Sequence, residues 1–243
     1  MAKRFLLVLS GIIFMTQLQA QQEDGQYLKK HYLRMYNQAL VYNDVNAAIG
    51  ALHGYLAEDN SIAYKDTLSV LYFTTRQFYS SLLLAEEVYK SAPDNIVAMA
   101  RAAECYDELG EAKTAIGLYE QVCPKIKNPY YYYKLALAQY QLKRTAESEL
   151  SAKMVIADTM SKKIGVNFTN VDGTQQAIPV NAAAANLLGV MQMDLKNYEQ
   201  AKLLFKQAVA FFPQFAGASQ NLQACEEKTK TPGKPATPKK PGK

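Results

Sequence analysis

A small side chain recurs along this sequence at nearly constant spacing. Alanine or serine returns after intervals of 33, 34, 33 and 53 residues, the last being one more period of 34 plus 19 residues, at positions Ala48, Ser81, Ala115, Ser148 and Ala201. Self-similarity with a period of roughly 20 to 50 residues indicates a repeat protein, whose units contact mainly their neighbours. This spacing constrains the fold more than any other feature of the chain.

Apolar residues flank each small residue at helical spacing, which indicates two antiparallel helices per repeat. In the third repeat, Ala103 and Tyr106 precede the turn, and Tyr119 and Val122 follow it. One helical pair cannot bury both of its apolar faces, so neighbouring pairs must stack. Close approach of two helices requires a small side chain where they cross. An ordinary helical bundle would not need small residues at a constant phase.

The segment from residue 181 to residue 213 gives the clearest unit. Its pattern consists of Ala185, Leu188-Gly189, Asn197-Tyr198, Ala201, Phe205, Ala208 and Pro213. This resembles the tetratricopeptide repeat (TPR), W-x2-L-G-x2-Y followed by A-x3-F and a proline, although the tryptophan is missing and Gln192 replaces the usual tyrosine. The resemblance implies an all-α fold, a right-handed α-solenoid of about five TPR helical hairpins. The predicted repeats cover residues 29–61, 62–95, 96–128, 129–161 and 182–215, and a capping helix covers residues 215–228.

An insertion at residues 163–180 breaks the helical period. Apolar residues alternate with polar ones on both sides of an Asp-Gly turn, at Ile164, Val166, Phe168, Ile178 and Val180. This pattern predicts a β-hairpin with strands near 164–170 and 174–180. Pro179 is expected where the ladder needs no backbone donor. The hairpin is either a binding element, because insertions between repeats often lie on one functional face, or a cover over an exposed helix edge.

The two ends of the chain differ in composition from its body. Residues 1–20 combine Lys3 and Arg4 with an apolar stretch and a small residue at Ala20, a pattern typical of a signal peptide that is removed on export. The apolar stretch is shorter than the ~20 residues that span a bilayer, so no integral membrane segment is expected after cleavage. Residues 229–243 are rich in proline and lysine, and we predict that this tail is disordered.

Positive charge is concentrated in these ends. Removing the eight charges of Lys3, Arg4 and the last six lysines from the net charge of +5 leaves about −3 for residues 21–227. A basic face of the kind that binds nucleic acid is therefore not expected. The alternative for the tail is contact with an anionic polymer or lipid phosphate.

The sequence holds no spacing typical of catalysis, and we expect no cofactor. Nucleotide-binding, hydrolase and metalloprotease motifs are absent. His31 and His53 have no companion ligand, so no metal site is predicted. Cys105, Cys123 and Cys225 lack metal-ligand spacing, and the first two would lie too far apart on antiparallel helices for a disulfide. We expect all three to be buried as small apolar residues.

The resemblance to TPR proteins also implies a binding site, because in that family the first helix of each unit lines a concave groove that holds a peptide. The candidate groove residues are Asn37, Asp66, Phe73, Arg101, Glu104, Asp107, Tyr130, Tyr133, Tyr140 and Met193. They combine an acidic middle with a ledge of tyrosines, while Tyr132 is expected in the core. One family branch grips a C-terminal carboxylate with a Lys/Asn/Arg clamp. Only Asn37 and Arg101 match its positions, so that recognition is not expected.

These features together predict an exported, non-enzymatic TPR scaffold or adaptor in a bacterial envelope, periplasmic or secreted. Its expected partner is a protein or peptide. Two alternatives remain open. One is a structural envelope component that self-associates through its end units or through the hairpin. The other is a module that tethers to the envelope through its lysine-rich tail.

Overall fold

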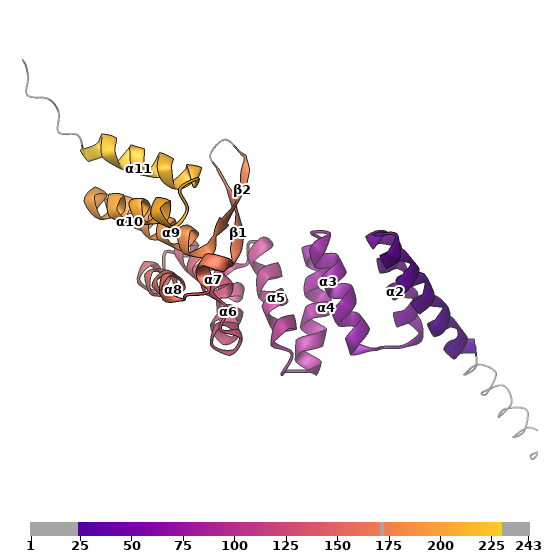
Figure 1. The fold of residues 1–243 in the computed structure, drawn as a ribbon. Helices are drawn as coiled ribbons and strands as arrows, with labels where there is room; N and C mark the ends of the chain where they lie inside the picture. The colour runs from indigo at the N-terminus through magenta and orange to yellow at the C-terminus, as the bar shows by residue number, and fades with distance from the viewer. Residues whose placement is uncertain (1–23, 171–172, 230–243) are drawn as a thin grey trace, which may run out of the picture. The chain divides into compact units, whose positions relative to one another are not determined.

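The computed structural model describes residues 24–170 and 173–229 (Figure 1). Within these residues the fold is all-α, with successive helical hairpins and one inserted two-stranded sheet, so the predicted fold class is confirmed. The chain divides into two compact units, Met1–Leu118 and Tyr119–Lys243, called unit 1 and unit 2 below. The predicted signal peptide and nearly all of the predicted tail lie outside the described residues.

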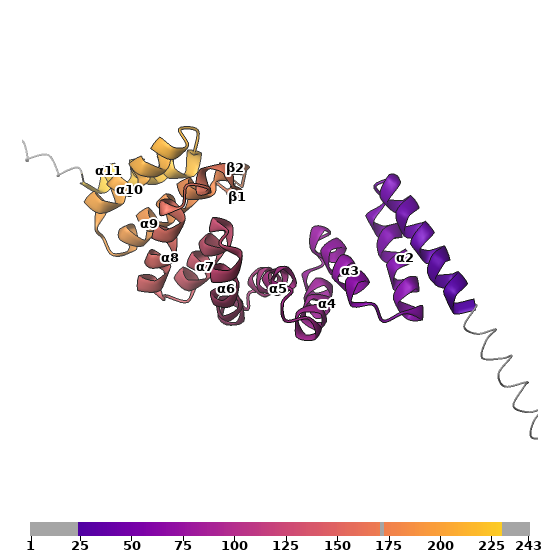
Figure 2. The same cartoon turned by 60° about the horizontal axis from the view of Figure 1, so that its bottom comes forward.

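Unit 1 is built from local helix contacts. Its described part contains a helical segment at residues 24–41, α2 (Val45–Glu58), α3 (Ile62–Thr74), α4 (Phe78–Ser91), α5 (Ile96–Glu108) and the start of α6 (Ala112–Ile126). Helix α4 packs against both α3 and α5 (Figure 2). One apolar cluster joins α2 to α3 through Leu52 and Leu68, and another joins α4 to α5 through Ala85 and Cys105. Each cluster therefore links the second helix of one hairpin to the first helix of the next.

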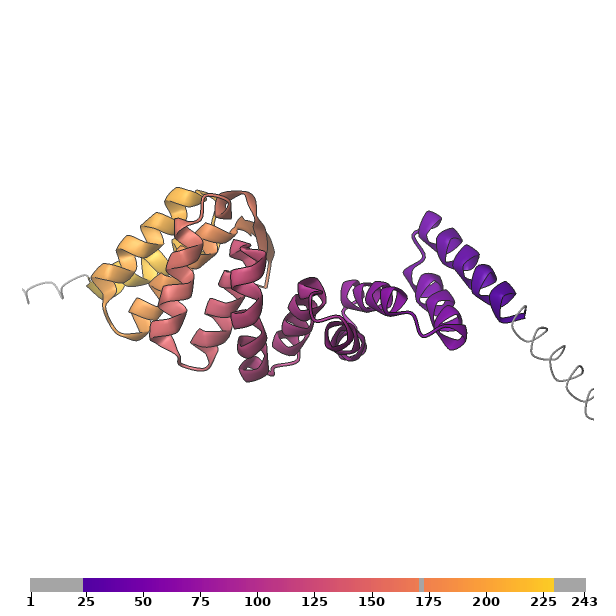
Figure 3. The same cartoon turned by 90° about the horizontal axis from the view of Figure 1, so that it is seen from below.

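Unit 2 is arranged around one central helix. After the end of α6 it contains α7 (Pro129–Gln141), α8 (Thr145–Ala157), the 3₁₀ turn η1 (Ser161–Lys163), β1 (Gly165–Thr169), β2 (Gln175–Pro179), α9 (Val180–Asp194), α10 (Tyr198–Phe211) and α11 (Ala216–Thr229). Helix α9 contacts α7, α8, α10, α11 and both strands. Figure 3 shows the helices and strands of this unit gathered together. Most residues of α9 are buried as a result. Helix α11 includes Thr229, which the sequence had placed in the tail.

The recurring small residues lie inside the helix crossings, as predicted. Their exposed fraction is 0% at Ala48, Ser81, Ala115, Ser148 and Ala201. The Ser81 hydroxyl donates to the carbonyl oxygen of Ser69 at 2.8 Å, and the Ser148 hydroxyl donates to that of Ala136 at 2.6 Å. Each bond joins the two helices of one hairpin. A serine is therefore tolerated in a buried crossing because its polar group has a partner.

In each helical hairpin, the turn between the two helices contains a residue in the left-handed backbone region. The φ angles are 53°, 59°, 84°, 61° and 61° at Asn43, Arg76, Gly110, Lys143 and Lys196. These positions repeat with the same intervals as the crossing residues. After the last of them, the Asn197 N–H donates to the carbonyl of Gln192 at 2.8 Å and closes α9 with a Schellman-type bond. Four residue types occupy this position, so the sequence alone does not reveal it.

The insertion forms the predicted β-hairpin, with Gly165 opposite Pro179. At its base the Val180 N–H donates to the Ile164 carbonyl at 2.8 Å. Hydrogen-bonded and non-hydrogen-bonded pairs alternate along an antiparallel ladder. The pair formed by Gly165 and Pro179 is therefore a non-hydrogen-bonded one, and Pro179 lies where no ladder donor is needed, as predicted.

The inner face of the hairpin belongs to the core of unit 2. Val166 and Ile178 are 8% and 1% exposed and pack with the apolar residues of α9. The Phe168 ring meets Phe215 edge to face, with 4.8 Å between ring centroids. Because this face is buried, the hairpin covers α9 and the start of α11. Its outer face is exposed at Gly165, Asn167 and Thr169.

Candidate protein-interaction surface

The ten candidate groove residues are divided between the two units, which we describe separately. Unit 1 holds Asn37, Asp66, Phe73, Arg101, Glu104 and Asp107, and unit 2 holds Tyr130, Tyr133, Tyr140 and Met193.

Arg101 and Asp66 form an ion pair that joins α5 to α3. Arg101 Nη1 lies 2.5 Å from Asp66 Oδ1, and the two side chains are 10% and 30% exposed. The same Nη1 lies 3.3 Å from the hydroxyl of Ser69, and the Asn95 amide donates to Asp66 at 3.3 Å. A charge is stable at low exposure when it is paired and hydrogen-bonded. The pair therefore links the first helices of two consecutive repeats and places Arg101 inside unit 1.

The other unit 1 candidates differ in exposure. Asn37 is exposed on the first helix, and Phe73 is half-buried. The Phe73 ring packs edge to face with Phe78, with 5.6 Å between centroids. Glu104 and Asp107 are half-buried on α5. Because they are three residues apart on one helix, they share a face.

The tyrosine run of α7 is oriented differently from the expectation. Tyr133 is 7% exposed and lies in the core of unit 2, where it packs with residues such as Ala136. Tyr132, which was expected in the core, is half-buried, as is Tyr130. Burial raises the pKa of Tyr133, because the phenolate would lose its hydration. Tyr130 is thus the more accessible of the two candidates in this run.

Tyr140 lies near the end of α7 and contacts α9. Its hydroxyl donates to Asp194 Oδ2 at 2.5 Å, and Lys143 Nζ lies 5.6 Å from the ring centroid. Burial and this hydrogen bond raise the pKa of Tyr140 to about 12. Met193, also from α9, is half-buried against a cluster that includes Phe205. Tyr140 therefore presents a half-buried ring held by two polar neighbours.

A polar cluster that sequence reasoning missed joins α4 to α5. The Tyr106 hydroxyl donates to Glu86 at 2.5 Å, and Lys90 forms an ion pair with Glu86 at 2.6 Å. The bond to Glu86, with burial, raises the pKa of Tyr106 to about 12. Burial opposes ionisation of Glu86, but the bonds from Lys90 and Tyr106 outweigh it and lower its pKa. The i,i+4 pair is visible in the sequence, whereas the tyrosine comes from the next repeat.

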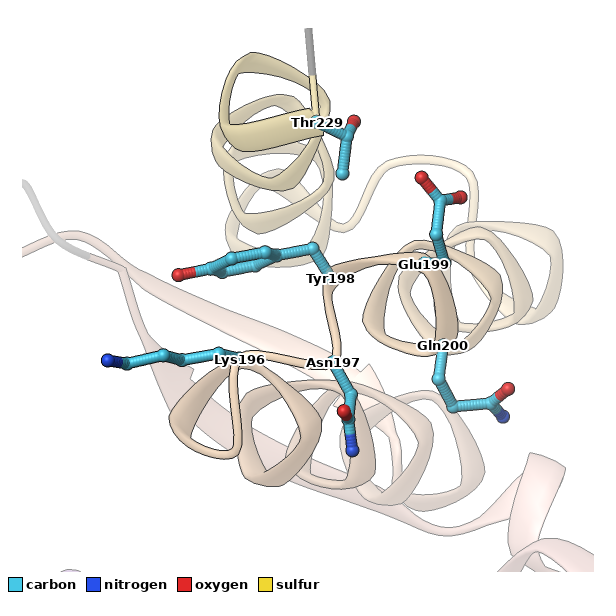
Figure 4. Close-up of a pocket in the computed structure, with 6 residues that line it drawn as sticks. All are labelled: Lys196, Asn197, Tyr198, Glu199, Gln200 and Thr229. Carbon is cyan, nitrogen blue, oxygen red and sulfur yellow. The ribbon is translucent and has the colours of Figure 1, made fainter. Parts of the chain in front are cut away.

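A shallow hollow of about 470 Å³ lies where the α9–α10 turn meets the end of α11 (Figure 4). It is lined by Lys196, Asn197, Tyr198, Glu199, Gln200 and Thr229. Figure 4 shows the Lys196 and Tyr198 side chains extending in the same direction. The hollow contains none of the ten candidates. Glu199 forms an ion pair with Lys202 at 2.8 Å, so its charge is already compensated.

The described residues give no arrangement suited to metal binding. Within residues 24–170 and 173–229, no three or more His, Cys, Asp or Glu side chains are grouped to hold an ion. The three cysteines are buried, as predicted. Burial raises the pKa of the Cys123 thiol to about 12, which disfavours the reactive thiolate. In the same part of the chain, no helix combines the length and apolar character needed to cross a bilayer.

Several solved structures share this arrangement of helices at low sequence identity. A tetratricopeptide repeat protein from Parabacteroides merdae matches with a TM-score of 0.64 and 13% identity, over 83% of this chain and 73% of that one. YrrB, described as a TPR protein with an unusual peptide-binding site, matches with a TM-score of 0.63 and 12% identity, over 79% and 90% of the two chains. MamA from Desulfovibrio magneticus matches with a TM-score of 0.62 and 15% identity, over 78% and 97%.

Comparisons of sequence add nothing to these likenesses. The sequence matches no protein-family model and no curated protein. The structural likeness, the buried crossing residues and the repeated turn geometry agree with one another. The chain therefore has the fold of the tetratricopeptide-repeat proteins.

Proposed function

We propose that the protein is a non-enzymatic scaffold that binds a segment of a protein partner along the first helices of its repeats. The observation that carries this proposal is the TPR fold. In such a stack, the first-helix face returns from repeat to repeat, so that each unit offers a row of side chains to an extended ligand. YrrB, a protein of similar fold, is described as having a peptide-binding site.

In unit 2, we assign the ligand contact to Tyr130 and Tyr140. Both rings are half-buried, and Tyr140 is already oriented by Asp194 and Lys143. A rigid aromatic side chain loses little conformational entropy on binding and offers a large contact area. Tyr133 has no such role here, since its side chain is part of the core.

Photo-crosslinking in the native host tests this assignment. A photoreactive phenylalanine analogue placed at Tyr140 should yield defined protein adducts, which mass spectrometry identifies. The matched control is the same analogue at Tyr79, which is 65% exposed and lies on α4, the second helix of its repeat. Adducts that are equal at both positions, or absent at Tyr140, would contradict the proposal.

The proposal includes export from the cytoplasm, for which the support is the composition of residues 1–20. Lys3 and Arg4, the apolar stretch and Ala20 follow the order of a cleaved signal peptide. N-terminal sequencing of the protein isolated from its host should begin at Gln21. Recovery of the chain with its first twenty residues intact would contradict this part of the proposal.

Self-association is a second candidate function, favoured by exposed apolar residues on the second helices of unit 2. Leu150 and Met154 on α8 are 63% and 45% exposed, and Leu203 on α10 is 61% exposed. Leu150 and Leu203 occupy the same position in their repeats. Exposed apolar groups of this kind mark interaction surfaces when they form a contiguous patch. Light scattering of the wild type and of Leu150→Lys distinguishes an assembly from a monomer.

A further inference from the structure

The outer edge of β1 in the inserted hairpin pairs with no other strand of the described residues. The Val180 N–H bonds to Ile164 at one end of the ladder, and the Asn170 N–H bonds to Thr174 at the other. Because hydrogen-bonded pairs alternate with non-hydrogen-bonded ones, the even-numbered residues of β1 direct their backbone groups towards β2. The backbone N–H and C=O of Gly165, Asn167 and Thr169 therefore point outward.

This outer edge of β1 is exposed and lacks the usual protection. Gly165, Asn167 and Thr169 are exposed, and no backbone bond to any residue in 24–170 or 173–229 reaches their outward groups. Natural sheets block free edges with charges, proline or bulges. The edge of β2 has Pro179 at an outward position, whereas β1 has neither charge nor proline.

The edge is also held in place before any ligand arrives. Val166 is 8% exposed within the core, and Phe168 packs on Phe215. Adding a strand to a fixed edge does not require the ordering of β1, which lowers the entropic cost of binding. A strand so added would place alternate side chains beside Val166 and Phe168, on the apolar side of the sheet.

We infer that the outer edge of β1 is a binding site for an extended protein segment, added antiparallel to β1 and carrying an acidic residue or free carboxylate at its C-terminal end. Two exposed lysines, Lys162 and Lys163, end η1 and are separated from Gly165, the first residue of β1, by Ile164 alone. In an antiparallel pair the C-terminal end of the added strand lies beside the start of β1, so these lysines select the charge at that end. The ligand thus alternates apolar and polar residues and ends in negative charge.

This inference rests on the proposed function only in taking a protein segment as the ligand, because the site lies outside the first-helix face. It is tested with a fluorescent synthetic peptide of alternating valine and threonine that ends in two aspartates. Fluorescence anisotropy should show saturable binding to the full chain. A peptide ending in two lysines should bind more weakly, and N-methylation of the residues that face β1 should abolish binding.

One pair of protein variants makes the test specific. Asn167→Pro removes an outward N–H of β1 without removing a ladder bond, and Val166 before it is already in a strand, as a residue preceding proline prefers. We expect this variant to weaken peptide binding by about tenfold or more, equivalent to about 1.4 kcal/mol. Ala177→Pro makes the same change on the β2 edge and should leave binding within about twofold.

The outcomes are distinguishable. Equal binding by the wild type and Asn167→Pro, or no saturable binding, overturns the inference. If Asn167→Pro does not fold, as judged by circular dichroism, the N-methylated peptide supplies the same comparison on the wild-type chain. A wild type that dimerises, and an Asn167→Pro variant that does not, assigns the edge to a second copy and also overturns it. Tyr140→Ala should not affect peptide binding, so failure of the proposed function leaves this result intact.

Discussion

Helices α3 and α9 are both first helices of a repeat, yet they are embedded very differently. In α3 only Leu68 and Ser69 are buried, whereas α9 buries nearly every residue from Val180 to Met191. The inserted hairpin contributes to the difference, because Val166 and Ile178 pack with the apolar residues of α9, and the described repeats of unit 1 carry no comparable insertion. The same repeat frame thus gives an open helix in unit 1 and a core helix in unit 2. Stability is therefore expected to be distributed unequally between the units.

The largest effect is expected where the hairpin enters the core. Ile178→Ala removes a side chain that is 1% exposed and leaves a cavity, so it should lower the free energy of unfolding by about 3 kcal/mol. The unit 1 control Val97→Ala, at a residue that is 58% exposed, should change it by less than about 0.5 kcal/mol. Urea denaturation followed by circular dichroism measures both. Equal small losses would mean that the hairpin is not part of the core.

A second contrast concerns two glycines that face aromatic rings. A Cβ at Gly189 of α9 would lie 2.4 Å from the Phe205 ring, and one at Gly54 of α2 would lie 2.3 Å from the Tyr32 ring. Phe205 is completely buried and cannot move aside, whereas Tyr32 is half-buried. Gly189→Ala should therefore cost about 2 kcal/mol and Gly54→Ala less than about 1 kcal/mol. Thermal denaturation gives the order, and the reverse order would contradict the difference in packing.

The third comparison tests the ion pair of unit 1 against a surface pair of unit 2. Asp66→Ala leaves the guanidinium of Arg101 without its carboxylate. Because Asp66 is 30% exposed, water partly screens the ion pair, and we expect the variant to lower the free energy of unfolding by about 1 to 2 kcal/mol. Adding Arg101→Met should recover most of it. Lys153→Ala, which breaks an exposed pair with Glu149, should cost less than about 0.5 kcal/mol.

A double-mutant cycle over Asp66 and Arg101 gives the coupling free energy directly. A coupling near zero would mean that the two charges act independently and that their ion pair does not help to join α3 to α5.

The repeat phase was readable from the sequence because it depends on the size of a few side chains. The position of Ala48 and Ser81 holds a small residue in each repeat, whichever way the repeats are aligned. The alternating pattern around residues 164–180 is likewise visible within a short stretch of sequence. The orientation of Tyr133 was not readable. Adjacent helix positions differ by about 100°, so a small error in phase exchanges the buried tyrosine for its neighbour. Burial of Arg101 depends on Asp66 in the preceding repeat, which no local pattern indicates.

The smallest expected effect lies in the turns between the two helices of a repeat, where the two units have different residues in the same backbone geometry. Gly110 in unit 1 has φ 84°, and Lys196 in unit 2 has φ 61°. A side chain in this region is unfavourable by roughly 1 kcal/mol, which glycine avoids. Gly110→Ala should therefore destabilise the protein by about 1 kcal/mol. Lys196→Gly should stabilise it by about 0.5 kcal/mol, because the relief of backbone strain is partly offset by the greater freedom of glycine in the unfolded chain. Opposite shifts of the urea midpoint are the expected result, and a loss of stability in Lys196→Gly would show that the lysine side chain contributes contacts that outweigh its backbone strain.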